Sequence, residues 1–361
     1  EGYDPFLMHD MKRAVERINN AIENEEKILV YGDYDADGIT STVLLVETLV
    51  SLGADVSSYI PNRFEEGYGP NKDAFSKIIK SGISLIITVD NGIAGVDEVE
   101  LANSLGCDVI ITDHHKIQDK IPKAYAVIHP EHPEGQYPFG KLAGVGVAFK
   151  LAHALLEIYP DFLLDLVAIG TVADMVSLTD ENRIFVKQGI ELLNEDPRIG
   201  IKMLLELSNI TTNIDEQTIG FYIAPKLNSI GRMDSAKVGL SFLMAEDVRS
   251  GVIYSAVIIA FLPILIPLTG KVLIKFPFLQ RFIRTSELRT EDGFTAKALD
   301  SDRFLDQEGV ALSTLRPSGT VVLDSGEHLD VVTRGEFIEQ GERVKVIKAE
   351  STWYVVEKIN V

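Results

Sequence analysis

The sequence predicts an α/β protein in which a doubly wound, mostly parallel sheet is followed by a helical extension, an apolar helix and a small β-barrel. Three observations predict this order. Short β-rich runs alternate with helix-like stretches at the start, the pattern becomes mostly helical from about Leu142, and short strands separated by turns follow from about Gly309. The expected parts are residues 1–141, 142–248, 249–285 and 286–361.

The first part consists of five-residue strand-like runs separated by helix-like stretches. Apolar runs that are joined through helices form parallel sheets with helices on both faces. The runs are Lys27–Tyr31, Val56–Ile60, Leu85–Val89 and Asp108–Thr112. The helices between them are expected at Ile39–Leu52, Asn71–Lys80 and Val96–Leu105.

The helical extension runs from Leu142 to Leu243, where the pattern is mostly helical. We expect it to complete the core that the sheet begins. Its helices are expected at Leu142–Tyr159, Asp161–Ala173, Asn182–Leu193 and Ile201–Leu207.

The segment Val252–Gly270 contains no charged residue over 19 positions. That length suits a membrane span, and a membrane helix tolerates the two prolines, Pro263 and Pro267. We therefore expect membrane anchoring through residues 252–270, with a buried helix pair as the alternative. The basic residues that follow would lie on the cytoplasmic side, and they are Lys271, Lys275, Arg281 and Arg284.

The tail alternates strand-like runs with turns, which is typical of small β-barrels. Turns are expected at Pro317–Gly319, Asp324–Gly326 and Glu339–Gly341. The strands are expected at Thr320–Leu323, Leu329–Thr333, Arg343–Ala349 and Trp353–Ile359.

The formal net charge of −20 argues against a protein that coats nucleic acid through a basic surface. Aspartates that bind cations contribute part of such a charge, so a metal-dependent nuclease with a local basic groove remains compatible with it. The single cysteine, Cys107, excludes a disulfide framework and is expected to be a small buried apolar residue.

Acidic and histidine residues follow three of the strand-like runs, at Gly32–Asp37, Asp90–Gly92 and Asp113–His115. Because ligands of open α/β sheets lie at the carboxyl ends of the strands, we expect these residues to converge on one point. In the first run, Asp33, Asp35 and Asp37 alternate along an extended chain and can share one face.

Carboxylates and imidazoles in such a cluster suit two divalent cations, which neutralise a phosphate and produce hydroxide near neutral pH. The string of alternating aspartates also resembles the start of a calcium loop, but Leu44 and Leu45 stand where that loop needs an acidic residue. Asp174, at the end of an apolar run, is either a further ligand or a helix cap.

Four short motifs in order, DYDADG, VDNG, TDHH and GTVADMV, resemble those of the DHH phosphoesterase family. Three longer segments, YIPNRFEEGYG, GKLAGVGVAFKL and PKLNSIGRMDSA, are similar to the RecJ-type single-strand exonucleases within it. The resemblance covers about residues 1–245. It does not extend to the second domain of those nucleases, because a glycine-rich, histidine-containing motif is missing after that point, so processive degradation is in doubt.

The resemblance implies two Mn²⁺ or Mg²⁺ ions bound by Asp35, Asp37, Asp90, His114 and Asp174. It implies that His115 faces the scissile phosphate, with Asp113 and Asp33 supporting the ligands. Arg232 would grip a substrate phosphate, unless it is a surface salt-bridge residue. Asn228 and Gly231 of the same motif, and Arg63, would also contact substrate. Other branches carry histidine at the position of Tyr31, so one ion would lack an imidazole.

The remaining part resembles another family. The segments GVALSTLRPSGTVVL, DVVTRGEFIEQGERVKVI and WYVVEKI look like the C-terminal OB-type barrel of NfeD-like membrane proteins. OB-type barrels bind single strands through aromatic residues, but core packing is the favoured interpretation of Phe337, Trp353 and Tyr354. A membrane protein and a DNA nuclease combine poorly, so we expect a junction between unrelated coding regions near Glu246–Gly251.

The expected function is a metal-dependent phosphodiesterase, a hydrolase that degrades single-stranded DNA from 5′ to 3′ in DNA repair and recombination. The expected location of this part is the cytoplasm. Two alternatives stay open. One is a phosphodiesterase for short oligonucleotides or cyclic dinucleotides, and the other is a membrane-anchored NfeD-like scaffold with an inert phosphoesterase half.

Overall fold

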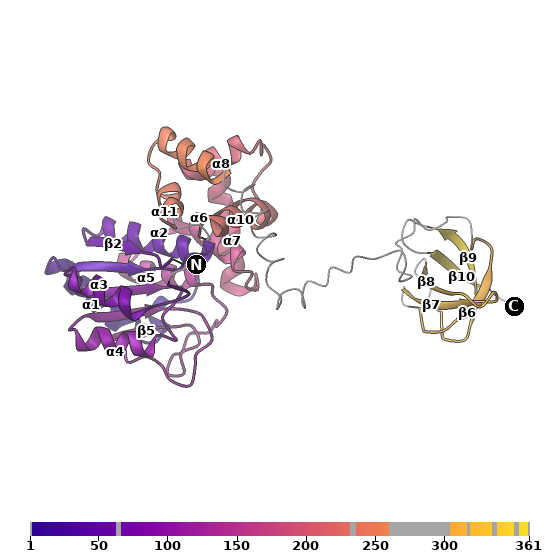
Figure 1. Cartoon of the computed structure of the whole chain (residues 1–361), viewed down its shortest axis with the longest axis horizontal. Helices are drawn as coiled ribbons and strands as arrows, with labels where there is room; N and C mark the ends of the chain where they lie inside the picture. Colours follow the sequence, from indigo (N-terminus) through magenta and orange to yellow (C-terminus); the bar gives the residue numbers. More distant parts are fainter. Residues whose placement is uncertain are drawn as a thin grey trace. The chain divides into compact units, whose positions relative to one another are not determined.

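The computed structural model describes residues 2–62, 66–231, 236–259, 304–315, 318–333, 338–349 and 354–359. The chain divides into two compact units, Glu1–Lys271 and Val272–Val361, drawn in Figure 1. Each unit is described by itself.

The first unit is built on a five-stranded sheet whose order is β2-β1-β3-β4-β5, with all neighbours parallel. The prediction of a parallel α/β sheet is confirmed. The last strand, of three residues, was not predicted from the sequence. The strands are β1 (Lys27–Tyr31), β2 (Asp55–Tyr59), β3 (Leu85–Val89), β4 (Asp108–Thr112) and β5 (Ala126–Ile128).

Helices cover both faces of the sheet, because alternate strand residues enter two separate cores. Ile28 and Val30 of β1 join the core that includes α1, α2 and α5. Leu29 and Tyr31 join the core that includes α3 and α4. The bounds are α1 (Met11–Glu23), α2 (Ala36–Ser51), α3 (Lys72–Lys80), α4 (Val96–Ser104) and α5 (Gly144–Leu156).

The chain continues into the predicted helical extension, which packs against α2 and α5 and shares their core. A π-helical turn, η3, joins two of its helices. The elements are η2 (Asp161–Leu163), α6 (Leu164–Ala173), α7 (Asp180–Glu195), α8 (Ile199–Leu207), α9 (Glu216–Thr218), η3 (Ile219–Ile223), α10 (Ala224–Gly231) and α11 (Ala236–Leu243). A short helical turn, η1 (Pro5–Leu7), precedes α1.

The first residues of the predicted membrane span pack onto this unit. Residues 248–259 are helical, Ser255 and Ile258 are buried, and the Ser255 hydroxyl donates to the Gly200 carbonyl oxygen at 3.2 Å. Within the ranges that the structure describes, no helix is both long enough and apolar enough to cross a membrane. Residues 260–270 of the predicted span lie outside those ranges.

The second unit is a closed barrel, as the sequence predicts, with the strand order β10-β8-β7-β6-β9; its first strand, β6, was not predicted. Its interior is apolar and includes Val321, Val346 and Tyr354. Tyr354 is therefore a core residue, whereas Phe337 and Trp353 lie outside the described residues. The strands are β6 (Glu308–Ala311), β7 (Ser318–Leu323), β8 (His328–Thr333), β9 (Arg343–Ala349) and β10 (Tyr354–Lys358).

Candidate metal centre

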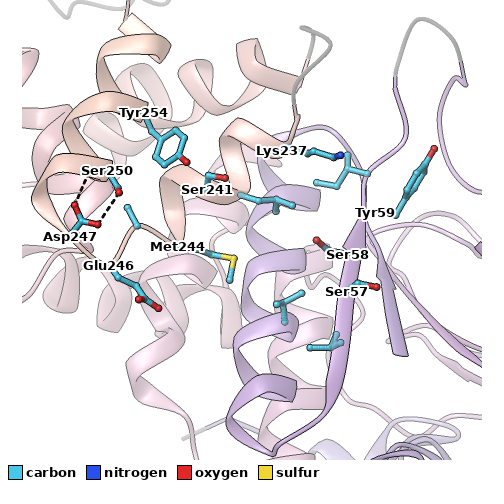
Figure 2. A pocket seen from close by; sticks show the side chains of 15 residues that line it. Ser57, Ser58, Tyr59, Lys237, Ser241, Met244, Glu246, Asp247, Ser250 and Tyr254 are labelled. Carbon is cyan, nitrogen blue, oxygen red and sulfur yellow. Dashed lines mark hydrogen bonds between the residues drawn. The ribbon is translucent and has the colours of Figure 1, made fainter. Parts of the chain in front are cut away.

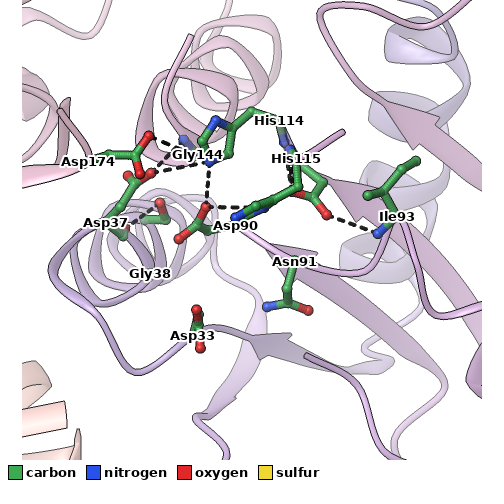
Figure 3. A network of polar contacts seen from close by, with 12 residues as sticks. Asp33, Asp37, Gly38, Asp90, Asn91, Ile93, His114, His115, Gly144 and Asp174 are labelled. Atoms are coloured by element: carbon green, nitrogen blue, oxygen red, sulfur yellow. Dashed lines mark hydrogen bonds and ion pairs between the residues drawn. The ribbon is translucent and has the colours of Figure 1, made fainter. Parts of the chain in front are cut away.

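Three neighbouring strands end at one edge of the sheet, and each is followed by candidate ligands. Asp33 follows β1, Asp90 follows β3, and Asp113–His115 follow β4. Asp37 lies in the first turn of α2, and Asp174 caps the C-terminus of α6. Figure 3 shows the carboxylates of Asp37, Asp90 and Asp174 grouped around His114. The structure therefore brings residues from four separate motifs to one place.

His114 is the centre of the first ligand group. Its Nε2 atom lies 3.0 Å from Oδ1 of Asp90, 3.7 Å from Oδ2 of Asp37 and 3.8 Å from Oδ2 of Asp174. Both Nε2 of His114 and Oδ1 of Asp90 are buried without a hydrogen-bond partner. Buried polar atoms are normally satisfied, so two adjacent orphan atoms indicate a binding site for a cation.

A second ligand group lies beside the first. Oxygens of Asp33, Asp35 and Asp90 all lie within 4.8 Å of one another, and Asp37, His114 and Asp174 form a group of the same size. Asp90 contacts the second of these groups as well, through His114. The arrangement therefore suits two ions that share Asp90.

The electrostatics of the cluster also favour cations. Burial, followed by neighbouring carboxylates, raises the pKa values of Asp37 and Asp90 well above their usual range. The same causes raise the pKa of Asp33 to about 7 and that of Asp174 to about 6. Burial, and then His115, lowers the pKa of His114 to about 4, so this ring is neutral and able to bind a metal. So many buried carboxylates ionise together only when positive charge is bound among them.

Comparison with known proteins agrees with this geometry. The family described as "DHH family, N-terminal domain" matches residues 27–171, and the "NfeD-like C-terminal, partner-binding domain" matches residues 301–358. The single-stranded-DNA-specific exonuclease RecJ of Bacillus subtilis is 54% identical over 246 residues, which cover 68% of this chain and 31% of the relative. RecJ of Escherichia coli is 42% identical over 256 residues, which cover 66% of this chain and 44% of the relative. The chain thus spans less than half the length of these relatives.

Solved structures agree as well. A crystal structure of exonuclease RecJ bound to manganese matches with a TM-score of 0.69 and 32% identity, covering 74% of this chain and 69% of that one. The chain belongs to the DHH family. RecJ from Thermus thermophilus in complex with Mn²⁺ has a TM-score of 0.66 and 30% identity over 74% of this chain and 40% of that one. The RecJ-type DHH part is joined here to an NfeD-like barrel.

The N-terminus of α5 holds Asp37 in the DHH site. The backbone N–H groups of Gly144 and Val145 donate to the two Asp37 oxygens at 2.7 and 2.8 Å. A Cβ atom at Gly144 would lie 2.4 Å from Oδ1 of Asp90. Glycine is therefore required sterically at this position, which the sequence analysis did not single out although it lies in the GKLAGVGVAFKL segment.

Asp113 does not reach the ligand groups but holds the loop that carries the histidines. It accepts from the backbone N–H of Ile93 at 2.9 Å and of His114 at 2.7 Å, and from Nδ1 of His115 at 2.7 Å. Burial acts to raise the pKa of Asp113, but these hydrogen bonds outweigh it and hold the pKa below its usual value. Burial similarly acts to lower the pKa of the partly exposed His115 ring, but the hydrogen bond and charge of Asp113 outweigh burial and raise this pKa above its usual value.

Tyr68 and His129 also position the histidine loop, and the sequence analysis missed both. The Tyr68 hydroxyl lies 3.0 Å from Nδ1 of His115. His129, directly after β5, donates from Nε2 to the His115 carbonyl oxygen at 2.8 Å, while its Nδ1 accepts from the Glu131 N–H at 3.0 Å. Both bonds together fix the tautomer of His129.

Tyr31 occupies the position at which other branches carry histidine. Its hydroxyl donates to the Gly69 carbonyl oxygen at 3.2 Å, and its ring stacks on Tyr59. Both contacts direct this side chain into the second core of the sheet, where Tyr31 is buried.

The predicted substrate residues are placed only in part. The Asn228 side chain accepts from the Ala36 N–H at 2.8 Å and lines a cavity of about 270 Å³ beside Asp174. Gly231 packs so closely on the Tyr34 carbonyl that a Cβ would overlap it, which is a packing role. The two predicted phosphate-binding arginines, Arg63 and Arg232, lie outside the described residues.

A larger cavity, of about 690 Å³, lies away from the ligand groups. Figure 2 shows it between the edge strand β2, helix α11 and the segment that includes Tyr254. Asp247 caps the helical segment there by accepting from the N–H and hydroxyl of Ser250. None of its lining residues belongs to the ligand groups, so the chemistry is assigned to the smaller cavity.

Proposed function

We propose that this chain hydrolyses phosphodiester bonds of single-stranded DNA with two Mn²⁺ or Mg²⁺ ions. The observation that carries the proposal is the pair of orphan atoms, Nε2 of His114 and Oδ1 of Asp90, surrounded by carboxylates. The manganese-bound RecJ structures support the choice of metal. The relatives are named single-stranded-DNA-specific exonucleases, which favours a strand over a cyclic dinucleotide and an enzyme over an inert scaffold.

We assign one ion to Asp37, Asp90, His114 and Asp174. The other ion is assigned to Asp35 and Asp90, with Asp33 close enough to support it. Bound ions of this kind neutralise the phosphate and supply hydroxide near neutral pH.

The protein's own groups would then hold the phosphate. His115, whose pKa Asp113 raises, would donate a hydrogen bond to a phosphate oxygen as negative charge develops there. Arg232 would bind a neighbouring phosphate through paired N–H groups. Asn228 would contribute less directly, by fixing the first turn of α2 that carries Asp37.

The chain covers less than half of the length of these relatives, so the direction of strand degradation is a proposal too. We propose 5′-to-3′ removal of nucleotides from single-stranded DNA in the cytoplasm, which the names of the relatives as single-stranded-DNA-specific exonucleases support in substrate class. For the barrel, the description of its family as partner-binding supports a role in binding another protein.

The test is release of mononucleotides from a labelled single strand in Mn²⁺, measured for the wild type and for Asp37→Asn. The asparagine keeps the volume and one acceptor oxygen for α5, so folding should survive. The matched control is Asp161→Asn, because Asp161 is exposed on η2. We expect loss of release in the first variant only. Equal release from all three proteins would exclude the assigned site.

A further inference from the structure

Two large apolar side chains extend into solvent where the backbone departs from regular geometry. Met175 is 89% exposed and has a φ of +58°, in the left-handed region that only glycine adopts easily. Phe221 is 76% exposed and lies within the π-helical turn η3. Both conformations are costly and persist mostly at functional sites.

Met175 borders the metal centre, and Phe221 lies on a helical segment that reaches it. Met175 follows Asp174 directly and lines the same cavity as Asn228. Phe221 precedes Asn228 by seven residues in one continuous helical segment, with the exposed Pro225 between them. Phe221 and Pro225 thus form a short exposed apolar strip on the segment that carries Asn228 to the cavity beside the metals.

The helical segment that carries Phe221 is also anchored to α6, next to Phe221. Gly220 lies beside Val172, because a Cβ atom added at Gly220 would be 3.6 Å from a Val172 methyl group. Val172 belongs to the last turn of α6, just before Asp174. Seven helical residues span about 10 Å, which is the length of about three stacked nucleotides. Phe221 thus lies within reach of bases next to a phosphate held at the metals.

We infer that Phe221 and Met175 form a stacking site for the bases of a single strand, an inference that rests on the proposed function. A phenyl ring stacks on any base, which makes such binding tolerant of sequence. A methionine side chain adapts to flat partners through its flexible, polarisable thioether. An apolar site also suits a chain of net charge −20, because it holds the strand without contacting its phosphates.

The experiment combines a protein variant with altered substrates. KM and kcat are measured in Mn²⁺ for the wild type, Phe221→Ala and Phe221→Tyr on a short 5′-phosphorylated strand. The same strand is then used with one abasic sugar at successive positions from the cleaved end. The control is Phe162→Ala, because Phe162 is a 54% exposed phenylalanine on η2, beyond the opposite end of α6. Mn²⁺ affinity is measured in every variant to show that the metal centre is intact.

For Phe221→Ala, we expect KM to rise about tenfold, a typical effect of losing one base–aromatic stack, with kcat changed less than about twofold. In the wild type, one abasic position should raise KM by a similar factor. That penalty should vanish in Phe221→Ala and return in Phe221→Tyr. Phe162→Ala should behave like the wild type.

Two negative results have different meanings. If Phe221→Ala keeps the wild-type KM and the wild-type abasic penalties, the stacking site is wrong while the proposed function stands. If the wild type releases no nucleotide from any strand although it binds Mn²⁺, the proposed function is wrong and the stacking site falls with it.

Discussion

Nε2 of His114 lies 3.0 Å from Oδ1 of Asp90, and neither buried atom has a hydrogen-bond partner. Leaving such groups unsatisfied costs about 1–3 kcal/mol each. An ion between them would remove that cost and would add the attraction of the surrounding carboxylates. The pair therefore links the fold of the DHH unit, which sets the two strand ends side by side, to the binding of metal.

Because Asp90 is near both ligand groups and Asp174 is near one, their removal should have different consequences. We expect the wild type to bind two Mn²⁺ ions per chain in isothermal titration calorimetry. Asp174→Asn should retain one ion, whereas Asp90→Asn should weaken both by at least about tenfold. Asp161→Asn is the control. Two intact ions in Asp90→Asn would show that this carboxylate is not shared.

The pH dependence of the metal-free protein follows from the raised pKa of Asp33, which is about 7 because of burial and then of Asp35. The unfolded value is about 3.9. The folded state thus holds this proton more tightly, so ionisation opposes folding. This destabilisation begins above about pH 4 and is complete above about pH 7.

We therefore expect metal-free Asp33→Asn to gain stability relative to the wild type as pH rises from about 5 to about 8, by on the order of 2 kcal/mol. Urea unfolding in the presence of a chelator measures the difference at each pH. Saturating Mn²⁺ should stabilise the wild type at the upper pH by about 3 kcal/mol at a hundredfold excess over Kd. A difference between variant and wild type that does not change with pH would contradict the assigned titration.

The positions of Asp90 and of the histidine pair could be predicted from the sequence because these residues follow strands of strong local pattern, whereas Asp37 and Asp174 lie at helix ends. The five-residue apolar runs before Asp90 and Asp113 fix both the strands and the edge at which they end. The barrel could be predicted for a similar reason, since its turns are short and marked by glycine.

Other features depend on contacts that no local pattern reports. Strand β5 has three residues, so His129 could not be recognised as a strand-end residue. Gly144 is constrained by Asp90, which lies far away in the sequence. Phe221 lies in a π-helical turn that the helical sequence pattern does not reveal. The apolar run that begins at Val252 looks like a membrane span by composition, although its first residues pack on α8.

Gly144 allows a direct test of close packing at the metal centre. In Gly144→Ala the new methyl group would meet Oδ1 of Asp90 at 2.4 Å, so the carboxylate or α5 must move. We expect a loss of about 1–3 kcal/mol in the free energy of unfolding, together with weaker Mn²⁺ binding. Gly220→Ala is the control, since its Cβ has room at 3.6 Å from Val172. Wild-type Mn²⁺ affinity in Gly144→Ala would show that the site tolerates displacement.

Lys150 and Glu181 form a fully buried ion pair far from the metals, and they tie the N-terminal segment to α5 and α7. Nζ of Lys150 also donates to the Tyr3 carbonyl oxygen at 2.7 Å, and Glu181 accepts from the N–H of Tyr3 at 2.9 Å and from the Tyr137 hydroxyl. Burial lowers the pKa of Lys150 below its usual value, and Glu181 offsets this effect only in part.

Removing one partner of such a pair leaves an uncompensated buried charge, so Lys150→Met should cost about 3–5 kcal/mol of unfolding free energy. Lys150→Met combined with Glu181→Gln removes both charges and keeps an acceptor oxygen for the Tyr3 N–H, while the new amide NH2 can donate to the Tyr137 hydroxyl oxygen. We expect the double variant to recover at least half of the loss in urea unfolding. Since neither residue touches the DHH ligands, Mn²⁺ affinity should remain at the wild-type value in every variant that is folded. A double variant no more stable than Lys150→Met would show that Lys150 contributes through its packing against Tyr137 and Phe185 and not through its charge.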